Sequence, residues 1–68
     1  MMQLKVNGVE EELAVTTLRE LLESRSIDPV ARFVAVAVNG SVVRRSEWST
    51  KLLGPGDDVE IVRPFSGG

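Results

Sequence analysis

The stretch M-Q-L-K-V-N-G-V-E-E-E-L-A-V-T-T-L-R-E-L-L, residues 2–22, decides the fold class of this chain. Its apolar residues Met2, Leu4 and Val6 alternate with polar ones, which is the pattern of a strand with one buried face. Asn7-Gly8 follows and tolerates the positive φ angles of a type I′ hairpin turn. The sequence therefore predicts a β-hairpin at the start of the chain.

The second strand of this hairpin is expected to include Val9, Leu13 and Val15 and to be interrupted by three glutamates at positions 10–12. Successive strand side chains point to opposite faces of a sheet, so the three carboxylates do not converge on one cation. We interpret them as a solvated strand surface.

A helix is predicted to begin after Thr17, because Thr17 and Glu20 have the spacing of a capping box. Leu18, Leu21 and Leu22 then recur at the spacing of one helical face. We expect this leucine stripe to pack on the sheet.

The helix should end by Arg25 or Ser26, because Pro29 disfavours helical geometry at the residue before it, Asp28. Ile27 is accordingly expected in the connecting loop.

The apolar run F-V-A-V-A-V, residues 33–38, predicts a central strand covered on one face and partly protected on the other. Asn39-Gly40 repeats the hairpin signal, and Val42 and Val43 should form a short fourth strand.

Ser46 is positioned to cap a single helical turn through Glu47 and Trp48. Trp48 has two interpretations, as a large side chain that closes the edge of the core or as a contact for a partner.

The segment G-P-G-D-D, residues 54–58, predicts a turn, and turn chemistry explains Asp57-Asp58 better than acid–base catalysis or a metal. Val59 and Ile61 should form a fifth strand that ends at Pro64. We expect one domain over residues 1–63 and a flexible tail over 64–68.

Composition excludes several functions. The 68 residues include no Cys and no His, so the commonest zinc ligands, the usual triad base and a thiol nucleophile are missing, and an autonomous enzyme is not expected. A net charge of −2 argues against nucleic-acid binding. The longest apolar run is too short for a membrane span, and the first residues lack a basic leader, which predicts a cytoplasmic protein.

The end of the sequence, Gly67-Gly68, is the candidate functional site. Because glycine has no side chain, such an end can enter a narrow channel and present its carboxylate to a partner's active site. Phe65 is either an anchor in a partner groove or a last core contact, and the sequence leaves both open.

The segments V-A-V-N-G (36–40), V-R-R-S-E-W (43–48) and L-G-P-G-D-D-V-E-I-V (53–62) resemble successive motifs of the ThiS family of sulfur carriers, in order and at the family's spacing. The resemblance covers nearly all of the chain. It implies an α+β, ubiquitin-like β-grasp fold: a mixed sheet of four to five strands with one helix packed across it, in ββαββ order. One departure is Phe65-Ser66, where many relatives have another glycine or a small aliphatic residue.

The resemblance also implies a function. The Gly68 carboxylate would be adenylated by an E1-like, ThiF-like adenylyltransferase that uses ATP and Mg²⁺, while the carrier itself binds no cofactor. Sulfur from a donor such as a cysteine desulfurase would convert it to a thiocarboxylate, which would supply a ThiG-like thiazole synthase. Gly68 would carry the sulfur, and Phe65, Ser66 and Gly67 would form the tail that enters the partners' active sites.

Other functions remain open at this point: the small subunit of molybdopterin synthase, a ubiquitin-like modifier of lysines, or an interaction module with an idle tail. The segment Ser46-Glu47-Trp48 and the short length favour the thiamine carrier over the molybdopterin synthase subunit.

Overall fold

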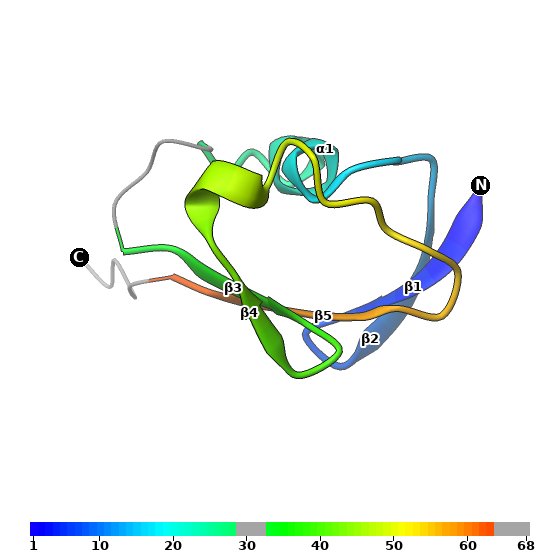
Figure 1. Cartoon of the computed structure of the whole chain (residues 1–68). Coiled ribbons are helices and arrows are strands. Elements are labelled where there is room, and N and C mark those ends of the chain that lie inside the picture. The colour runs from blue at the N-terminus through cyan, green and yellow to red at the C-terminus, as the bar shows by residue number, and fades with distance from the viewer. Residues whose placement is uncertain (29–32, 64–68) are drawn as a thin grey trace.

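A computed structural model describes residues 1–28 and 33–63, which form a mixed sheet with helical segments on one face (Figure 1). The strands are β1 (Met2–Val6), β2 (Val9–Leu13), β3 (Ala35–Val38), β4 (Ser41–Val43) and β5 (Asp58–Val62), and the helices are α1 (Leu18–Ser24) and the 3₁₀ turn η1 (Arg45–Glu47). The strand order is β2-β1-β5-β3-β4. Only β1 and β5 are parallel neighbours in this sheet. This architecture is the predicted β-grasp fold.

Helix α1 begins with the predicted capping box. The backbone N–H of Glu20 donates to Thr17 Oγ1 at 3.2 Å, and the backbone N–H groups of Thr16 and Thr17 donate to Glu20 Oε1 at 2.7 and 3.0 Å. These donors favour the ionised carboxylate and lower the pKa of Glu20. The helix start is thereby fixed by two side chains of its own first turn.

The same helix ends at Ser24, as the sequence predicted to within two residues. Ser26 adopts a φ of 59°, and the N–H groups of Ser26 and Ile27 donate to Glu23 and Leu22 carbonyl oxygens at 3.0 Å each. This is a Schellman motif, which satisfies the last carbonyls of the helix. Ile27 lies outside the helix as expected, but it is buried and belongs to the core.

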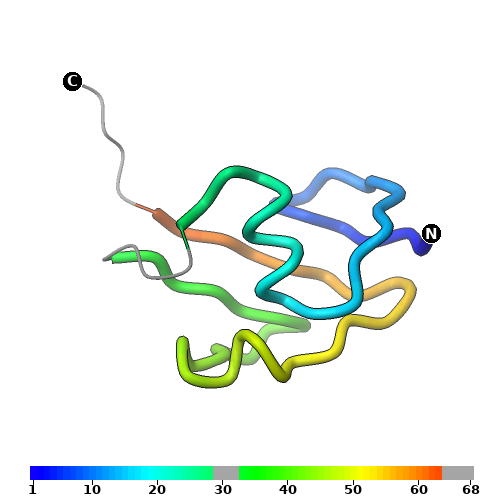
Figure 2. Tube along the Cα trace, turned by 90° about the horizontal axis from the view of Figure 1, so that it is seen from above, coloured from blue at the N-terminus to red at the C-terminus, as the bar shows by residue number. Residues whose placement is uncertain are grey.

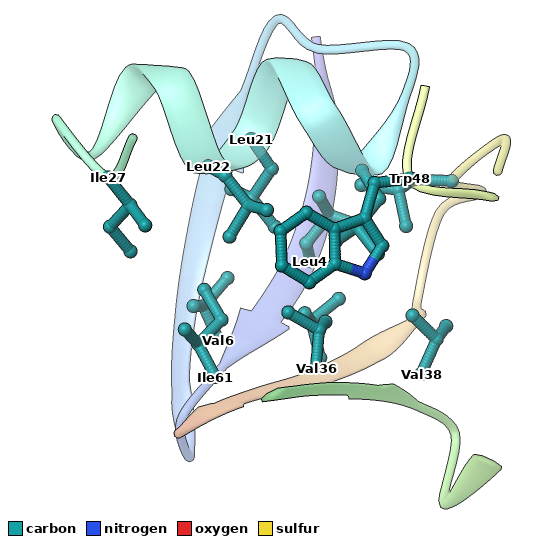
Figure 3. Packing of buried hydrophobic residues seen from close by; sticks show 12 residues of the cluster. Leu4, Val6, Leu21, Leu22, Ile27, Val36, Val38, Trp48 and Ile61 are labelled. Carbon is teal, nitrogen blue, oxygen red and sulfur yellow. The ribbon is translucent and has the colours of Figure 1, made fainter. Parts of the chain in front are cut away.

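The hydrophobic core lies between α1 and the sheet (Figure 3). The predicted leucine stripe of Leu18, Leu21 and Leu22 is fully buried. In the described parts of the chain, no helix is long and apolar enough to cross a membrane.

Trp48 is a core residue, which decides between its two interpretations. Its side chain is 2% exposed and its Nε1–H donates to the Val43 carbonyl at 2.9 Å. Figure 3 shows the ring between α1 and the sheet, facing Val36. The indole therefore fastens β4 and η1 to the core.

Three strand predictions need correction. The second strand ends at Leu13 rather than Val15, and it runs through the three glutamates without interruption. The third strand begins at Ala35 rather than Phe33, because Phe33 has a φ of 65°, which no strand residue adopts. It is an inner strand of the sheet as expected, because it lies between β5 and β4.

Candidate functional site at the end of strand β5

The predicted site residues Phe65, Ser66, Gly67 and Gly68 lie outside the described part of the chain. The structure describes the strand from which they follow, β5, and its next residue, Arg63. The geometry of the site is therefore the geometry that fixes β5.

Strand β5 is held on both sides and from above. It pairs with β1 in parallel and with β3 antiparallel, so that Val59 lies beside both Val6 and Val38. The side chains of Val59 and Ile61 are buried beneath α1. The strand that leads to the C-terminal residues is consequently the middle strand of the sheet, between β1 and β3 (Figure 2).

Asn7 extends the pairing of β1 with β5 beyond the point where the backbone of β1 turns away. Its own N–H donates to the Val59 carbonyl at 2.9 Å, and its Oδ1 accepts the Ile61 N–H at 2.7 Å. The side-chain oxygen thus replaces the carbonyl that a longer parallel strand would have supplied.

Asn39 fixes the other end of β5. Its Oδ1 accepts the Asp58 N–H at 2.9 Å, and its Nδ2–H donates to Asp57 Oδ1 at 3.0 Å. Asp57 Oδ2 accepts the Gly54 N–H at 2.7 Å. The Gly54 N–H first, and the Asn39 amide second, lower the pKa of the Asp57 carboxyl.

The predicted turn over residues 54–58 is thus confirmed up to Asp57, and Asp58 already belongs to β5. Turn chemistry explains Asp57, as expected. Within residues 1–28 and 33–63, no group of three acidic side chains is arranged to hold a metal ion.

The face of the sheet opposite α1 is exposed, and it has an acidic part and an apolar part. Strand alternation and register place five charged side chains on the β2, β1 and β5 part of this face, all exposed: Lys5, Glu10, Glu12, Asp58 and Glu60. Four carboxylates with one lysine make this part acidic.

The other part of the open face is apolar. Val62 pairs with Ala35, and Ala37 pairs with Val42, so these four side chains share the open face. Val62 and Val42 are 62% and 78% exposed, and Phe33, two residues before Ala35, is 77% exposed. We call Ala35, Ala37, Val42 and Val62 the end patch, because it includes Val62, the last residue of β5.

Sequence reasoning missed the roles of both turn asparagines. The Asn-Gly pattern indicated their positive φ angles, which the structure confirms at 49° for Asn7 and 52° for Asn39. Nothing local indicated that both side chains bind β5, because Asn7 and Ile61 are 54 positions apart. The pairing of Glu11 with Arg25 was missed for the same reason.

A mixed five-stranded sheet packed against one helix, with Gly-Gly five residues after the last residue of the middle strand, is typical of a ubiquitin-like β-grasp protein. Comparisons with known proteins identify one family within this class. The model of the ThiS family matches residues 4–68. The chain belongs to the ThiS family.

Two solved structures support this assignment. A crystal structure of the thiamine biosynthesis protein ThiS from Geobacter metallireducens is 30% identical, has a TM-score of 0.79, and covers 98% of this chain and 100% of its own. A solution structure of a thiamine biosynthesis protein from the same organism is 30% identical, with a TM-score of 0.78 over 98% of this chain and 88% of its own. A search among curated protein sequences found no match.

Proposed function

We propose that this protein is a sulfur carrier for the thiazole moiety of thiamine, and that it acts as a cosubstrate rather than an enzyme. The carboxylate of Gly68 is adenylated by an E1-like, ThiF-like enzyme with ATP and Mg²⁺. It is then converted to a thiocarboxylate that supplies a ThiG-like thiazole synthase. The observation that carries the proposal is the match to the ThiS family, which extends through Gly67-Gly68.

The chemistry of a terminal carboxylate explains why activation comes first. With a pKa of roughly 3.3 to 3.7, the group is ionised at neutral pH, and its delocalised charge repels nucleophiles. When a Gly68 oxygen attacks the α-phosphorus of ATP, pyrophosphate leaves and an acyl adenylate forms. The outer sulfur of a donor persulfide, such as that of a cysteine desulfurase, then displaces AMP at the carbonyl carbon. A thiolate breaks the resulting S–S bond, which releases the thiocarboxylate and leaves a disulfide on the donor side.

The fold supports this role by fixing where the last residues start. β5 is held in mid-sheet by β1, β3, Asn7 and Asn39. Five residues, 64–68, span at most about 17 Å when extended, which is enough to reach a buried partner site. A rigid root gives the partner a defined position from which to guide Gly68 into its active site.

The test changes the position of the terminal carboxylate and leaves residues 1–63 unchanged. We expect that deleting Gly68, or adding one residue after it, abolishes ATP–pyrophosphate exchange with the cognate adenylating enzyme. Each change shifts the reacting atom by roughly 3.3 to 3.6 Å, whereas attack requires a separation of about 3 to 3.5 Å. Circular dichroism should show an unchanged fold. Wild-type exchange by the variant without Gly68 would contradict the proposal.

The consuming reaction is tested separately by intact mass. Carrier purified from its native cell should include a form in which sulfur replaces one terminal oxygen. That form should lose its sulfur when incubated with the thiazole synthase and its substrates. A thiocarboxylate that the thiazole synthase leaves untouched would instead favour the molybdopterin branch, and a carrier joined to lysines would favour a protein modifier.

A further inference from the structure

We propose that a groove between the first hairpin and the residues after α1 binds the side chain of Phe65 in the free carrier, and that this contact opens before Gly68 is adenylated. The binding site is independent of the proposed function, whereas its effect on adenylation rests on that function. We call this groove the hairpin groove.

The hairpin groove lies at one end of the hydrophobic core and has room for one aromatic ring. Its lining includes four apolar residues and two arginines: Val6, Val9, Ile27, Ile61, Arg25 and Arg63. Figure 3 shows Ile27 across from Val6 and Ile61 at this end of the core. The groove has a volume of about 260 Å³, and a cavity of about 150 Å³ accommodates benzene. A phenyl side chain therefore fits it in size and in chemistry.

The core is incompletely closed at the hairpin groove. Ile27 and Ile61 belong to the core but are 6% and 8% exposed, whereas the exposure of Leu21 is 0%. Val9 is 59% exposed, and its pairing with Val6, which is buried under α1, places it on the same side of the sheet. One more apolar side chain here would cover Val9 and remove further apolar surface from water, which favours the contact.

The direction of β5 selects Phe65 as the occupant. Side chains alternate along the strand, so Ile61 faces α1 and Val62 belongs to the end patch on the opposite face. Arg63 follows on the α1 side and lines the groove. Pro64 disfavours helical geometry at Arg63, so the alternation should continue to Phe65, about 7 Å beyond Arg63. Phe65 is thus the next apolar side chain of β5's direction on the side of the groove.

The groove also has a hydrogen-bond donor for the backbone beside Phe65. Arg25 binds Glu11 Oε2 through its Nη2, but its Nε is buried, and no group within residues 1–28 and 33–63 accepts a hydrogen bond from it. A buried donor without an acceptor costs free energy. A carbonyl oxygen beside Phe65 would satisfy this donor, which favours the bound chain over the free one.

This occupant accounts for the departure of Phe65-Ser66 from the pattern of many relatives, which have glycine or a small aliphatic residue there. A chain end without a bulky side chain has nothing to place in the hairpin groove. The contact is accordingly a property of this chain and not of the family.

A bound Phe65 shortens the reach of the terminal carboxylate. With Phe65 in the groove, the three residues after it extend at most about 10 Å, against about 17 Å for the five residues 64–68. A buried partner site that needs the longer reach takes only carrier whose Phe65 has left the groove. The KM for the carrier therefore depends on the fraction of carrier in which the groove is open.

The contact is tested first without any enzyme, by NMR of the full chain. The chain has two phenylalanines, so the ring protons of Phe65 are assigned by comparison with Phe65→Ala. We expect nuclear Overhauser effects between the Phe65 ring and the methyl groups of Val9, Ile27 and Ile61. Absence of these effects in the free carrier would overturn the proposal.

A double-mutant cycle then connects Phe65 to the wall of the groove. Phe65→Ala and Val9→Thr should each lower the thermal midpoint by roughly 2–6 °C, and the double variant should lose less than the sum, because both changes remove the same contact. Val42→Thr is the matched control, at 78% exposure on the other edge strand, and its effect should add fully to that of Phe65→Ala. Additive losses in both pairs would contradict the contact.

The sign of the kinetic effect distinguishes this site from an anchor in a partner groove. In ATP–pyrophosphate exchange with the cognate adenylating enzyme, Phe65→Ala should lower the KM for the carrier about three- to tenfold, because more of the carrier is open. An aromatic anchor in the enzyme predicts a higher KM instead. Phe65→Leu keeps an apolar side chain and should lie between wild type and Phe65→Ala. A KM that rises or stays the same for Phe65→Ala would overturn the opening step.

The outcomes separate this inference from the proposed function. Wild-type carrier that supports no exchange would contradict the proposed function, while the nuclear Overhauser effects would still establish the binding site for Phe65. Exchange by a carrier that shows no such effects would leave the function in place and overturn the hairpin groove as the site of Phe65.

Discussion

The two hairpins of the sheet have the same type of turn, Asn-Gly, but their second strands differ in length and composition. Asn7-Gly8 has φ angles of 49° and 83°, and Asn39-Gly40 has 52° and 83°. The strand after the first turn, β2, has five residues and three glutamates, whereas the strand after the second, β4, has three residues and two valines. The same local chemistry therefore leads to an acidic edge on one side of the sheet and an apolar edge on the other.

The two edges are also fastened differently. Glu11 of β2 pairs with Arg25 at the end of α1, and both side chains are 31% exposed. The Val43 carbonyl of β4 instead accepts the indole N–H of Trp48, which is fully inside the core. Charged residues discourage another strand from pairing with β2. The comparison teaches that the β2 edge is protected by charge, while the β4 edge, which β3 separates from β5, remains apolar.

The largest expected loss of stability comes from removing the side chain that fastens the second hairpin to the core. We expect Trp48→Ala to lower the free energy of unfolding by about 3–5 kcal/mol, because it opens a cavity and removes the Val43 hydrogen bond. Such a loss approaches the whole stability of a small domain, so Trp48→Phe provides a milder variant. Urea unfolding followed by circular dichroism measures both.

The control for that prediction is Arg45→Gln. The Arg45 guanidinium carbon lies 5.0 Å from the centroid of the Trp48 ring, and an exposed cation–π contact contributes about 0.5–1 kcal/mol. Equal losses for Trp48→Ala and Arg45→Gln would mean that the indole does not fasten β4 through burial.

The second prediction compares how much Asn7 and Asn39 contribute to the free energy of unfolding. Asn7→Gly keeps the turn but leaves the N–H of buried Ile61 without its acceptor, and we expect a loss of about 1–3 kcal/mol. Asn39→Gly removes bonds to exposed groups that water replaces, so its loss should be nearer 0.5–1.5 kcal/mol, roughly. Chemical denaturation gives both values. A larger loss for Asn39→Gly would reverse the assigned importance of the two turns for β5.

A smaller effect is expected at the ion pair of the first hairpin. Glu11→Gln should lower the free energy of unfolding by about 0.5–1 kcal/mol, because the pair with Arg25 is partly exposed. The difference from wild type should shrink in high salt, where surface charges are screened. A salt-independent loss above about 2 kcal/mol would show that β2 depends on a buried contact instead.

The smallest expected effect is the change of stability with pH that comes from Asp57, which contacts Asn39 of the second hairpin. The lowered pKa of Asp57 contributes stability that is present above the ordinary carboxyl range near pH 4 and is lost as pH falls through the pKa in the folded protein. Asp57→Asn should therefore be destabilising at pH 7, and the difference from wild type should narrow below about pH 4. Thermal midpoints from pH 2.5 to 7 measure this.

The control is the same substitution in the Asn39→Gly background. One of the two hydrogen bonds that lower the pKa of Asp57 is then missing, so the pH-dependent difference should be smaller. A difference that grows toward acid pH in either background would contradict the sign of the effect.

Local signals account for the features that the sequence predicted well. The capping box at Thr17, both Asn-Gly turns and the leucine stripe each depend on residues within a few positions of one another. The prediction was wrong for Phe33, because an apolar run indicates strand propensity but not the residue at which the strand begins. Of the proposed site, Gly68 and its neighbours Phe65, Ser66 and Gly67 stay predictions.

The sequence by itself determined which segments are strands and which is the helix, since these depend on hydrophobic period, capping and turn residues along the chain. Only the tertiary structure decided that β5 is the middle strand, that Asn7 and Asn39 hold it, and that an apolar patch adjoins its end. The physical reason is that strand order, cross-strand hydrogen bonds and surface neighbours join residues far apart in the chain. Their energies depend on the packed sheet, and no local pattern specifies them.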